Sequence, residues 1–118
     1  MTTLTAELED EIRDALGLVC RAAGLDPSGV QLIKYTINAV FRLPREGVVV
    51  RIGIGPMAEA RALRLTRIAT WLNAHDAPVP RLVTGIDQPV CVGKYAATVW
   101  EELPPRNPGW TTKPLGAA

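Results

Sequence analysis

Residues 37–52 read INAVFRLPREGVVVRI, and this stretch decides the fold. Every second side chain from Ile37 to Leu43 is apolar, and a β-branched run follows Gly47 after a Pro-Arg-Glu segment. Alternation and β-branched runs are typical of strands, and a short connection rich in Pro and Gly joins two strands as a hairpin. A further strand begins at residue 30 with Val-Gln-Leu-Ile. We therefore expect a three-stranded antiparallel meander.

A helix is predicted on each side of this meander. Residues 4–23 carry apolar side chains at spacings of three and four and acidic side chains in the first turns, as an amphipathic helix does. Residues 57–73 form the second helix after the Gly/Pro segment 53–56. We expect its exposed face to carry Arg61, Arg64 and Arg67, and its buried face to carry Leu65, Ile68, Ala69 and Leu72.

The remaining strands are expected after this second helix. Two short strands are predicted around residues 81–84 and 89–92, and a longer one covers residues 94–100. With the meander they make a sheet of about five strands. The predicted fold class is therefore α+β: a five-stranded antiparallel sheet with a helix inserted after strand three, preceded by an N-terminal helix.

Composition and charge exclude several classes of protein. The 118 residues, 47% of them hydrophobic, suffice for one buried core and exclude disorder. A net charge of +1 gives no general attraction to nucleic acid or to an anionic membrane. No apolar run reaches the ~20 residues of a bilayer span, and the polar, acidic start from Thr2 to Asp10 is unlike a signal peptide. Cys20, Cys91 and His75 lack zinc-ligand spacing, so we expect a cytoplasmic protein without a metal site.

Several motifs follow one another in a recognisable order. A single basic residue, Arg51, lies in the apolar run 48–52, and Glu59 stands in the first turns of the second helix. The chain then continues through Ala77-Pro78-Val79-Pro80 to Thr98-Val99-Trp100-Glu101-Glu102-Leu103-Pro104. With the strand order, these motifs resemble the N-terminal lobe of the protein-kinase-like phosphotransferases. The resemblance covers residues 28–116 and is closest to the aminoglycoside phosphotransferase/choline kinase-like family.

The resemblance gives Arg51 the role of the basic residue that contacts the α- and β-phosphates of ATP. Glu59 would pair with Arg51 on the concave side of the sheet. Strand alternation places Val49 on the same face as Arg51, where it would cover the adenine ring together with Val40. On the residues alone, Arg51 could instead lie at a sheet edge or extend its charge to solvent, and Glu59 could complement the helix dipole.

The strand end and the first hairpin complete the expected nucleotide site. By resemblance Trp100 occupies the gatekeeper position, and the Glu101 carbonyl and the Leu103 amide bond the adenine. The alternative is a plain strand end with an exposed acidic pair.

Between the first two strands, Leu32 and Val40 have the spacing of a kinase phosphate loop, but Ile33, Tyr35 and Asn38 replace its glycines. Thr36 and Asn38 could donate side-chain hydrogen bonds to phosphate oxygens, or the segment is an ordinary turn.

The catalytic elements of the family have no counterpart in these residues. Neither its His-x-Asp-x-x-x-x-Asn loop nor its later metal-binding Asp can be found. The resemblance therefore implies a lobe that binds ATP, with Mg²⁺ only if a catalytic lobe is supplied, and that transfers no phosphoryl group by itself. In a full-length relative, the γ-phosphoryl group would pass to a small-molecule hydroxyl. The alternatives are a non-catalytic interaction or dimerisation module and an unrelated α+β domain.

The expected organisation has three segments. Residues 1–27 form the helix packed on the lobe, residues 28–105 the nucleotide-binding small lobe, and residues 106–118 the start of a large lobe. Without a large lobe, the cleft side chains Val40 and Val49 and the strand end from Trp100 to Leu103 would be exposed. Exposed apolar surface of this kind is typical of interfaces, so the expected partners are a nucleotide and either the large lobe or a second copy of the chain.

Overall fold

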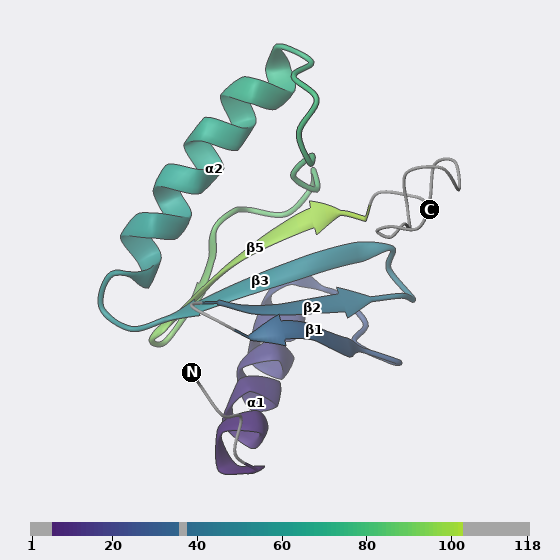
Figure 1. Cartoon of the computed structure of the whole chain (residues 1–118), viewed down its shortest axis with the longest axis vertical. Coiled ribbons are helices and arrows are strands. Elements are labelled where there is room, and N and C mark those ends of the chain that lie inside the picture. The colour runs from purple at the N-terminus through teal and green to yellow at the C-terminus, as the bar shows by residue number, and fades with distance from the viewer. Residues whose placement is uncertain (1–5, 36–37, 103–118) are drawn as a thin grey trace, which may run out of the picture.

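The computed structural model describes residues 6–35 and 38–102, and it confirms the α+β fold class. A five-stranded antiparallel sheet with the order β1-β2-β3-β5-β4 separates two helices, α1 and α2, which lie on opposite faces (Figure 1). Neither helix within the described ranges is long and apolar enough to cross a bilayer. The elements are α1 (Ala6–Ala23), β1 (Gln31–Tyr35), β2 (Ala39–Leu43), β3 (Val48–Ile54), α2 (Ala58–Ala74), β4 (Val90–Val92) and β5 (Tyr95–Glu101).

The hydrophobic core lies between α1 and one face of the sheet. Phe41, Val50 and Val99 are cross-strand neighbours in β2, β3 and β5, and each is fully buried. Helix α1 covers them with side chains that recur every three or four residues, which places them on one side of the helix. The predicted amphipathic helix is thus confirmed over its described part. Its buried residues are Ile12, Ala15, Leu16, Val19 and Cys20.

The predicted hairpin between β2 and β3 is confirmed. The amides of Glu46 and Gly47 both donate to the Leu43 carbonyl, and Gly47 has a φ of 67°, which favours glycine. Five consecutive residue pairs join the strands, from Ala39 opposite Ile52 to Leu43 opposite Val48. This register turns Phe41 and Val50 toward α1 and Val40 and Val49 toward the opposite face.

Strand β1 pairs with β2 through a β-bulge. Leu32 lies opposite Phe41, but Lys34 lies opposite Val40, so Ile33 is an extra residue without a partner. Leu32 packs against the core, and so does Tyr35, although they are three positions apart and regular alternation would put them on opposite faces. The bulge therefore moves Lys34 from the core face of the sheet to the opposite face.

Helix α2 crosses the face of the sheet that α1 leaves free. Its first turns approach closely because small residues meet there: Ala58, Ala62 and Ala96 form a buried cluster. A Cβ atom on Gly53 would lie only 3.4 Å from the Ala58 Cβ. The predicted buried face is wrong in one respect, because the Ile68 side chain is 51% exposed. The three arginines at 61, 64 and 67 are exposed, as expected.

The chain returns from α2 to the sheet along the outer side of β5. Asn73 holds this return segment, because its Nδ2 donates to the Pro80 carbonyl and its Oδ1 accepts from the Leu82 amide. The strand predicted at 81–84 is reduced to a single bridge between Leu82 and Trp100. The Gln88 side chain takes the place of a longer strand, since its amide bonds both the N–H and the C=O of Val99.

Candidate functional site

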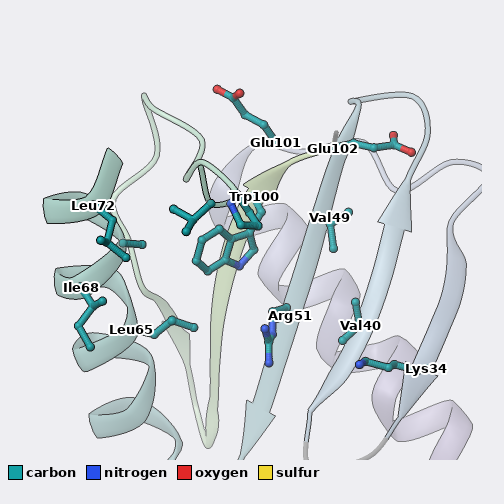
Figure 2. A pocket seen from close by; sticks show the side chains of 13 residues that line it. Lys34, Val40, Val49, Arg51, Leu65, Ile68, Leu72, Trp100, Glu101 and Glu102 are labelled. Atoms are coloured by element: carbon teal, nitrogen blue, oxygen red, sulfur yellow. The ribbon is translucent and has the colours of Figure 1, made fainter. Parts of the chain in front are cut away.

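A cleft of about 570 Å³ lies between α2 and the sheet face that α1 does not cover (Figure 2). The sheet supplies one wall, the inner side of α2 supplies the other, and two acidic residues stand at one end. The sheet wall is formed by Lys34, Val40, Val49, Arg51 and Trp100; the opposite wall by Leu65, Ile68, Ala69, Leu72, Val79 and Pro80; and the acidic end by Glu101 and Glu102.

The middle of the cleft is apolar, and a hydrogen bond orients its aromatic ring. Val49 and Trp100 are cross-strand neighbours, and both face the helix side chains of α2. The indole Nε1 of Trp100 donates to the Thr98 hydroxyl at 2.9 Å, and that hydroxyl lies on the same face of β5 and is buried. This hydrogen bond orients the ring, so the cleft has a fixed aromatic wall suited to a flat apolar ligand.

Arg51 supplies a free positive charge next to this apolar surface. It lies in β3, between β2 and β5, so the alternative of an arginine at a sheet edge is wrong. Val40 and Thr98 are its cross-strand neighbours. The side chain is exposed to the cleft and makes no hydrogen bond or ion pair with another described residue. The guanidinium is therefore available to an anionic ligand.

The ion pair predicted between Arg51 and Glu59 is not formed. Ala58 and Ala62 point from α2 into the sheet, and Glu59 is rotated about 100° from Ala58 around the helix. Glu59 is exposed, lines no part of the cleft, and its charge contributes to raising the pKa of Cys91 after the larger effect of burial. The Glu59 carboxylate thus acts on Cys91 of β4 and makes no ion pair with Arg51.

The acidic end of the cleft is formed where β5 ends. The Glu101 amide donates to the Arg81 carbonyl at 2.8 Å, and the Glu102 amide donates to the Gly47 carbonyl at 3.0 Å. The Glu102 carboxylate pairs with Arg42, whereas the exposed Glu101 side chain makes no hydrogen bond or ion pair with another described residue. Glu101 thus lines one end of the cleft.

The predicted phosphate-loop residues lie in different places. Leu32 packs against the α1 core, so its assignment to the nucleotide site is wrong, and the bulge in β1 is consistent with that position. Asn38 lines a smaller hollow of about 80 Å³ that adjoins the cleft at Arg51. Two predicted site residues, Thr36 and Leu103, lie outside the described residues.

The expectation that the cleft side chains are exposed is partly wrong. Val40 and Trp100 are each only 8% exposed, and Val49 is half-buried. Because α2 and the segment with Val79 and Pro80 form the facing wall, the chain itself shields these residues. The motive for self-association through the sheet face is correspondingly reduced.

Sequence reasoning missed two cationic residues of this site. Lys34 lines the cleft, and Arg61, which was expected only on a solvated helix face, lines the adjoining hollow. One signal for Lys34 was present: Leu32 and Tyr35 are both apolar but three residues apart, which breaks strand alternation and is what a bulge produces.

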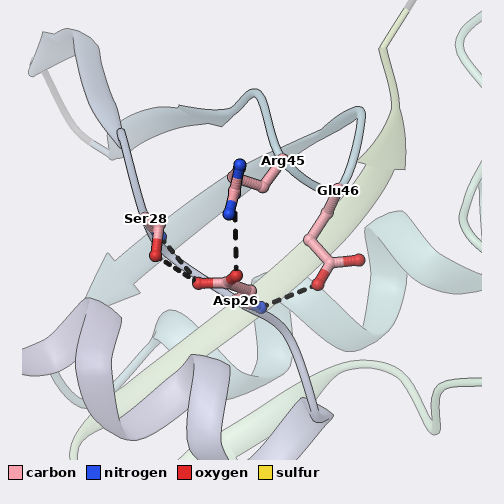
Figure 3. A network of polar contacts seen from close by, with 4 residues as sticks. All are labelled: Asp26, Ser28, Arg45 and Glu46. Atoms are coloured by element: carbon pink, nitrogen blue, oxygen red, sulfur yellow. Dashed lines mark hydrogen bonds and ion pairs between the residues drawn. The ribbon is translucent and has the colours of Figure 1, made fainter.

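A separate polar cluster around Asp26 is structural. The Asp26 carboxylate accepts hydrogen bonds from the Ser28 amide and hydroxyl, and Arg45 approaches it at 3.9 Å (Figure 3). The Ser28 hydrogen bonds and, to a lesser degree, the Arg45 charge lower the pKa of Asp26. The Asp26 amide also donates to Glu46 at 2.8 Å. These contacts tie the loop after α1 to the β2–β3 turn.

The two cysteines and the acidic groups suggest no second centre. Burial raises the pKa of the Cys20 thiol to about 11, which keeps it protonated and unreactive at neutral pH. Cys91 is exposed on β4. Within residues 6–35 and 38–102, no group of three or more His, Cys, Asp or Glu side chains is placed to hold a metal ion.

The cleft thus joins a cationic end, an apolar middle and an acidic end within one cavity. Such an arrangement suits a ligand with a flat apolar ring and an anionic group. In comparisons with known proteins, no family model, no curated protein and no solved structure matches this chain.

Proposed function

We propose that the cleft binds an adenine nucleotide, as the small lobe of an aminoglycoside phosphotransferase/choline kinase-like small-molecule kinase does. One observation carries the proposal. Val40, Val49, Arg51 and Trp100 were each expected at a nucleotide from their positions in the sequence, and these residues of three different strands line a single cleft. In a full-length kinase of this kind, ATP would pass its γ-phosphoryl group to a hydroxyl of a small molecule.

The apolar middle of the cleft would hold the adenine ring. The ring would lie between Val49 and Trp100 on the sheet and Leu72 on α2, where it is shielded from water on both faces. The Glu101 carbonyl and the Leu103 amide would bond its polar edge. Arg51 would then meet the phosphates with charge-assisted hydrogen bonds, the strongest polar contacts available at this site.

Calorimetric titration of the chain with ADP tests the proposal. Arg51→Met keeps the aliphatic stem and removes the charge, so it should weaken ADP binding by about tenfold or more. Arg67→Met is the matched control, because Arg67 is exposed on α2 and lines neither the cleft nor the hollow. Absence of ADP binding to the unaltered chain, or equal loss in both variants, would contradict the proposal.

Phosphoryl transfer needs a positioned base and a metal site, for which these 118 residues contain no matching motif. We therefore propose binding without turnover for this chain alone. Incubation with ATP and Mg²⁺ should release no phosphate and phosphorylate no aminoglycoside. A turnover that depends on Mg²⁺ and is lost in Arg51→Ala would require a different account of the site.

A second candidate is a non-catalytic module that binds a second copy of this chain. The observation that favours it is the exposure of Ile68 and Trp71 on α2, at 51% and 61%. The Trp71 ring stacks on His75 with centroids 4.1 Å apart, and it is 61% exposed in this arrangement. Sedimentation equilibrium at micromolar concentration tests this candidate. A dimer that Trp71→Ser dissociates would support it, and a monomer throughout would exclude it.

A further inference from the structure

One row of side chains crosses the sheet at the cationic end of the cleft. Lys34, Val40, Arg51 and Thr98 are successive cross-strand neighbours in β1, β2, β3 and β5. Side chains that lie opposite each other on paired strands point to the same face. Lys34 therefore shares the cleft face with Arg51, and in Figure 2 its side chain extends from β1 toward Arg51. The bulge at Ile33 is what brings Lys34 onto this face.

The spacing of this row suits one anionic group held from two sides. Neighbouring strands lie about 4.8 Å apart, so the Cα atoms of Lys34 and Arg51 are separated by about 10 Å, with Val40 between them. Both side chains are long and flexible. They can converge on a phosphate group above Val40, which itself offers only an apolar surface.

Arg61 adds a third positive charge on the opposite side of Arg51. It projects from α2 and lines the hollow that Arg51 and Asn38 also line. Neither Arg64 nor Arg67 lines the cleft or this hollow, so Arg61 is set apart from the other arginines of α2 by its position. In place of the expected carboxylate of Glu59, α2 thus presents a guanidinium on the Arg51 side.

The three positive charges have no counter-ion in the described part of the chain. The ion pairs between described residues join Arg13 to Glu9, Arg42 to Glu102, Arg45 to Asp26 and Lys94 to Glu11, none of which involves these cations. No carboxylate lines the hollow, and those of the cleft, Glu101 and Glu102, stand at the end of β5. Like charges gathered without a counter-ion repel each other, and an anion at their centre relieves that repulsion.

We infer that Lys34, Arg51 and Arg61 together form a binding site for a chain of linked phosphates. This inference rests on the proposed function for the nucleotide part of the ligand, but the cation site stands on its own geometry. The acidic end of the cleft repels a phosphate chain, so the ligand lies with its phosphates at Lys34 and Arg61 and its ring toward Glu101. Lys34 and Arg61 supply the donors that backbone amides supply in a glycine-rich phosphate loop.

The test uses the complete chain and four ligands: ATP, AMP, adenosine and inorganic tripolyphosphate, each by calorimetric titration. Lys34→Met and Arg61→Met remove one charge each and keep much of the aliphatic length. Each variant should bind ATP and tripolyphosphate about tenfold more weakly than the unaltered chain does. Its affinity for adenosine should be unchanged, because only the phosphate contacts are lost. Arg64→Met and Arg67→Met remove the same charge from α2 outside the site and should change none of the four. Thermal unfolding shows whether each variant is folded, and Lys34→Arg should restore binding.

The arms separate this inference from the proposed function. Suppose that tripolyphosphate binding depends on Lys34 and Arg61, that ATP binds no more tightly than tripolyphosphate, and that adenosine does not bind. The cation site then holds and the nucleotide proposal fails. If ATP and adenosine bind equally well, the cleft takes a nucleoside and the inference is overturned. If Lys34→Met and Arg61→Met bind ATP with the same affinity as the control variants, neither residue contacts the phosphates and the inference is likewise overturned.

Discussion

Val49 and Val50 are neighbours in β3 that face opposite sides of the sheet, so identical substitutions at the two positions test the assignment of the faces. Val50 is fully buried and its cross-strand neighbours are Phe41 and Val99. Val49 is half-buried, lies beside Trp100 and lines the cleft. We expect Val50→Ala to reduce the stability of the fold with little effect on ADP binding. We expect Val49→Ala to weaken ADP binding with little effect on stability.

The magnitudes follow from burial. Val→Ala removes two carbon atoms, worth about 0.8 kcal/mol each when buried, and the sealed void left at position 50 raises the cost to about 2–3 kcal/mol. At position 49 the void opens into the cleft and part of the side chain is already exposed, so the cost stays below about 1 kcal/mol. If the cleft binds ADP as proposed, loss of the same carbons from its wall should weaken ADP binding about fivefold in Val49→Ala.

Urea unfolding followed by circular dichroism measures the first effect, and calorimetric titration with ADP measures the second. With a slope of about 1–2 kcal/mol per molar urea, Val50→Ala should lower the unfolding midpoint by about 1–3 M. Its ADP affinity should stay within about twofold of the unaltered chain, since the position does not touch the cleft. Equal losses of stability in the two variants, or equal losses of ADP affinity, would refute the separation of the sheet into a core face and a ligand face.

Three further predictions concern the rest of the fold. The pKa of Glu11 lies below its ordinary value of 4.5, chiefly because the carboxylate is hydrogen-bonded to Lys94. The stability that this carboxylate contributes is therefore present above pH 4.5 and is lost as the pH falls through the lowered pKa. Urea titrations of Glu11→Gln across acidic pH should therefore show a shallower loss of stability than the unaltered chain, and identical acid profiles would contradict this. Asn73→Ala removes both hydrogen bonds to the return segment, so it should lower the free energy of unfolding in urea by about 1–3 kcal/mol and weaken ADP binding. An unchanged urea midpoint would show that other contacts hold the segment. A thiol reagent should modify exposed Cys91 in the native protein and buried Cys20 only on unfolding, and simultaneous reaction of both would contradict the core described here.

Much of the fold could be predicted because its signals are local. The alternation before Leu43, the β-branched run after Gly47 and the apolar spacing of α1 each report which face of one element is buried. Those patterns predicted the succession of strands and helices along the chain and placed Val49 and Arg51 on one face of a strand, whereas the assignment of that face to a ligand came from the family resemblance. They could not give the strand expected at 81–84, because the Gln88 side chain bonds β5 where a backbone would otherwise pair.

The errors at the candidate site have two physical causes. The ion pair of Glu59 with Arg51 was wrongly predicted because the rotation of α2 about its axis was unknown. The contact of Ala58 and Ala62 with the sheet fixes which residues of α2 face Arg51. That contact depends on residues far away in the sequence, such as Ala96. Leu32 was wrongly assigned to the nucleotide site, and Lys34 was missed, because of a one-residue change of register. A bulge exchanges the faces of every residue beyond it.

The bulge in β1 also affects how the protein behaves in concentrated solution. β1 is one of the two outermost strands, and an outermost strand offers unpaired backbone groups to any other strand that approaches. The extra residue at Ile33 distorts that row of groups, and Lys34 beside it repels a second copy carrying the same charge. Deleting Ile33 would remove the bulge, leave Lys34 opposite Val40 and give a regular edge open to strand addition. The irregularity that moves a lysine into the cleft thus also protects the sheet from aggregation.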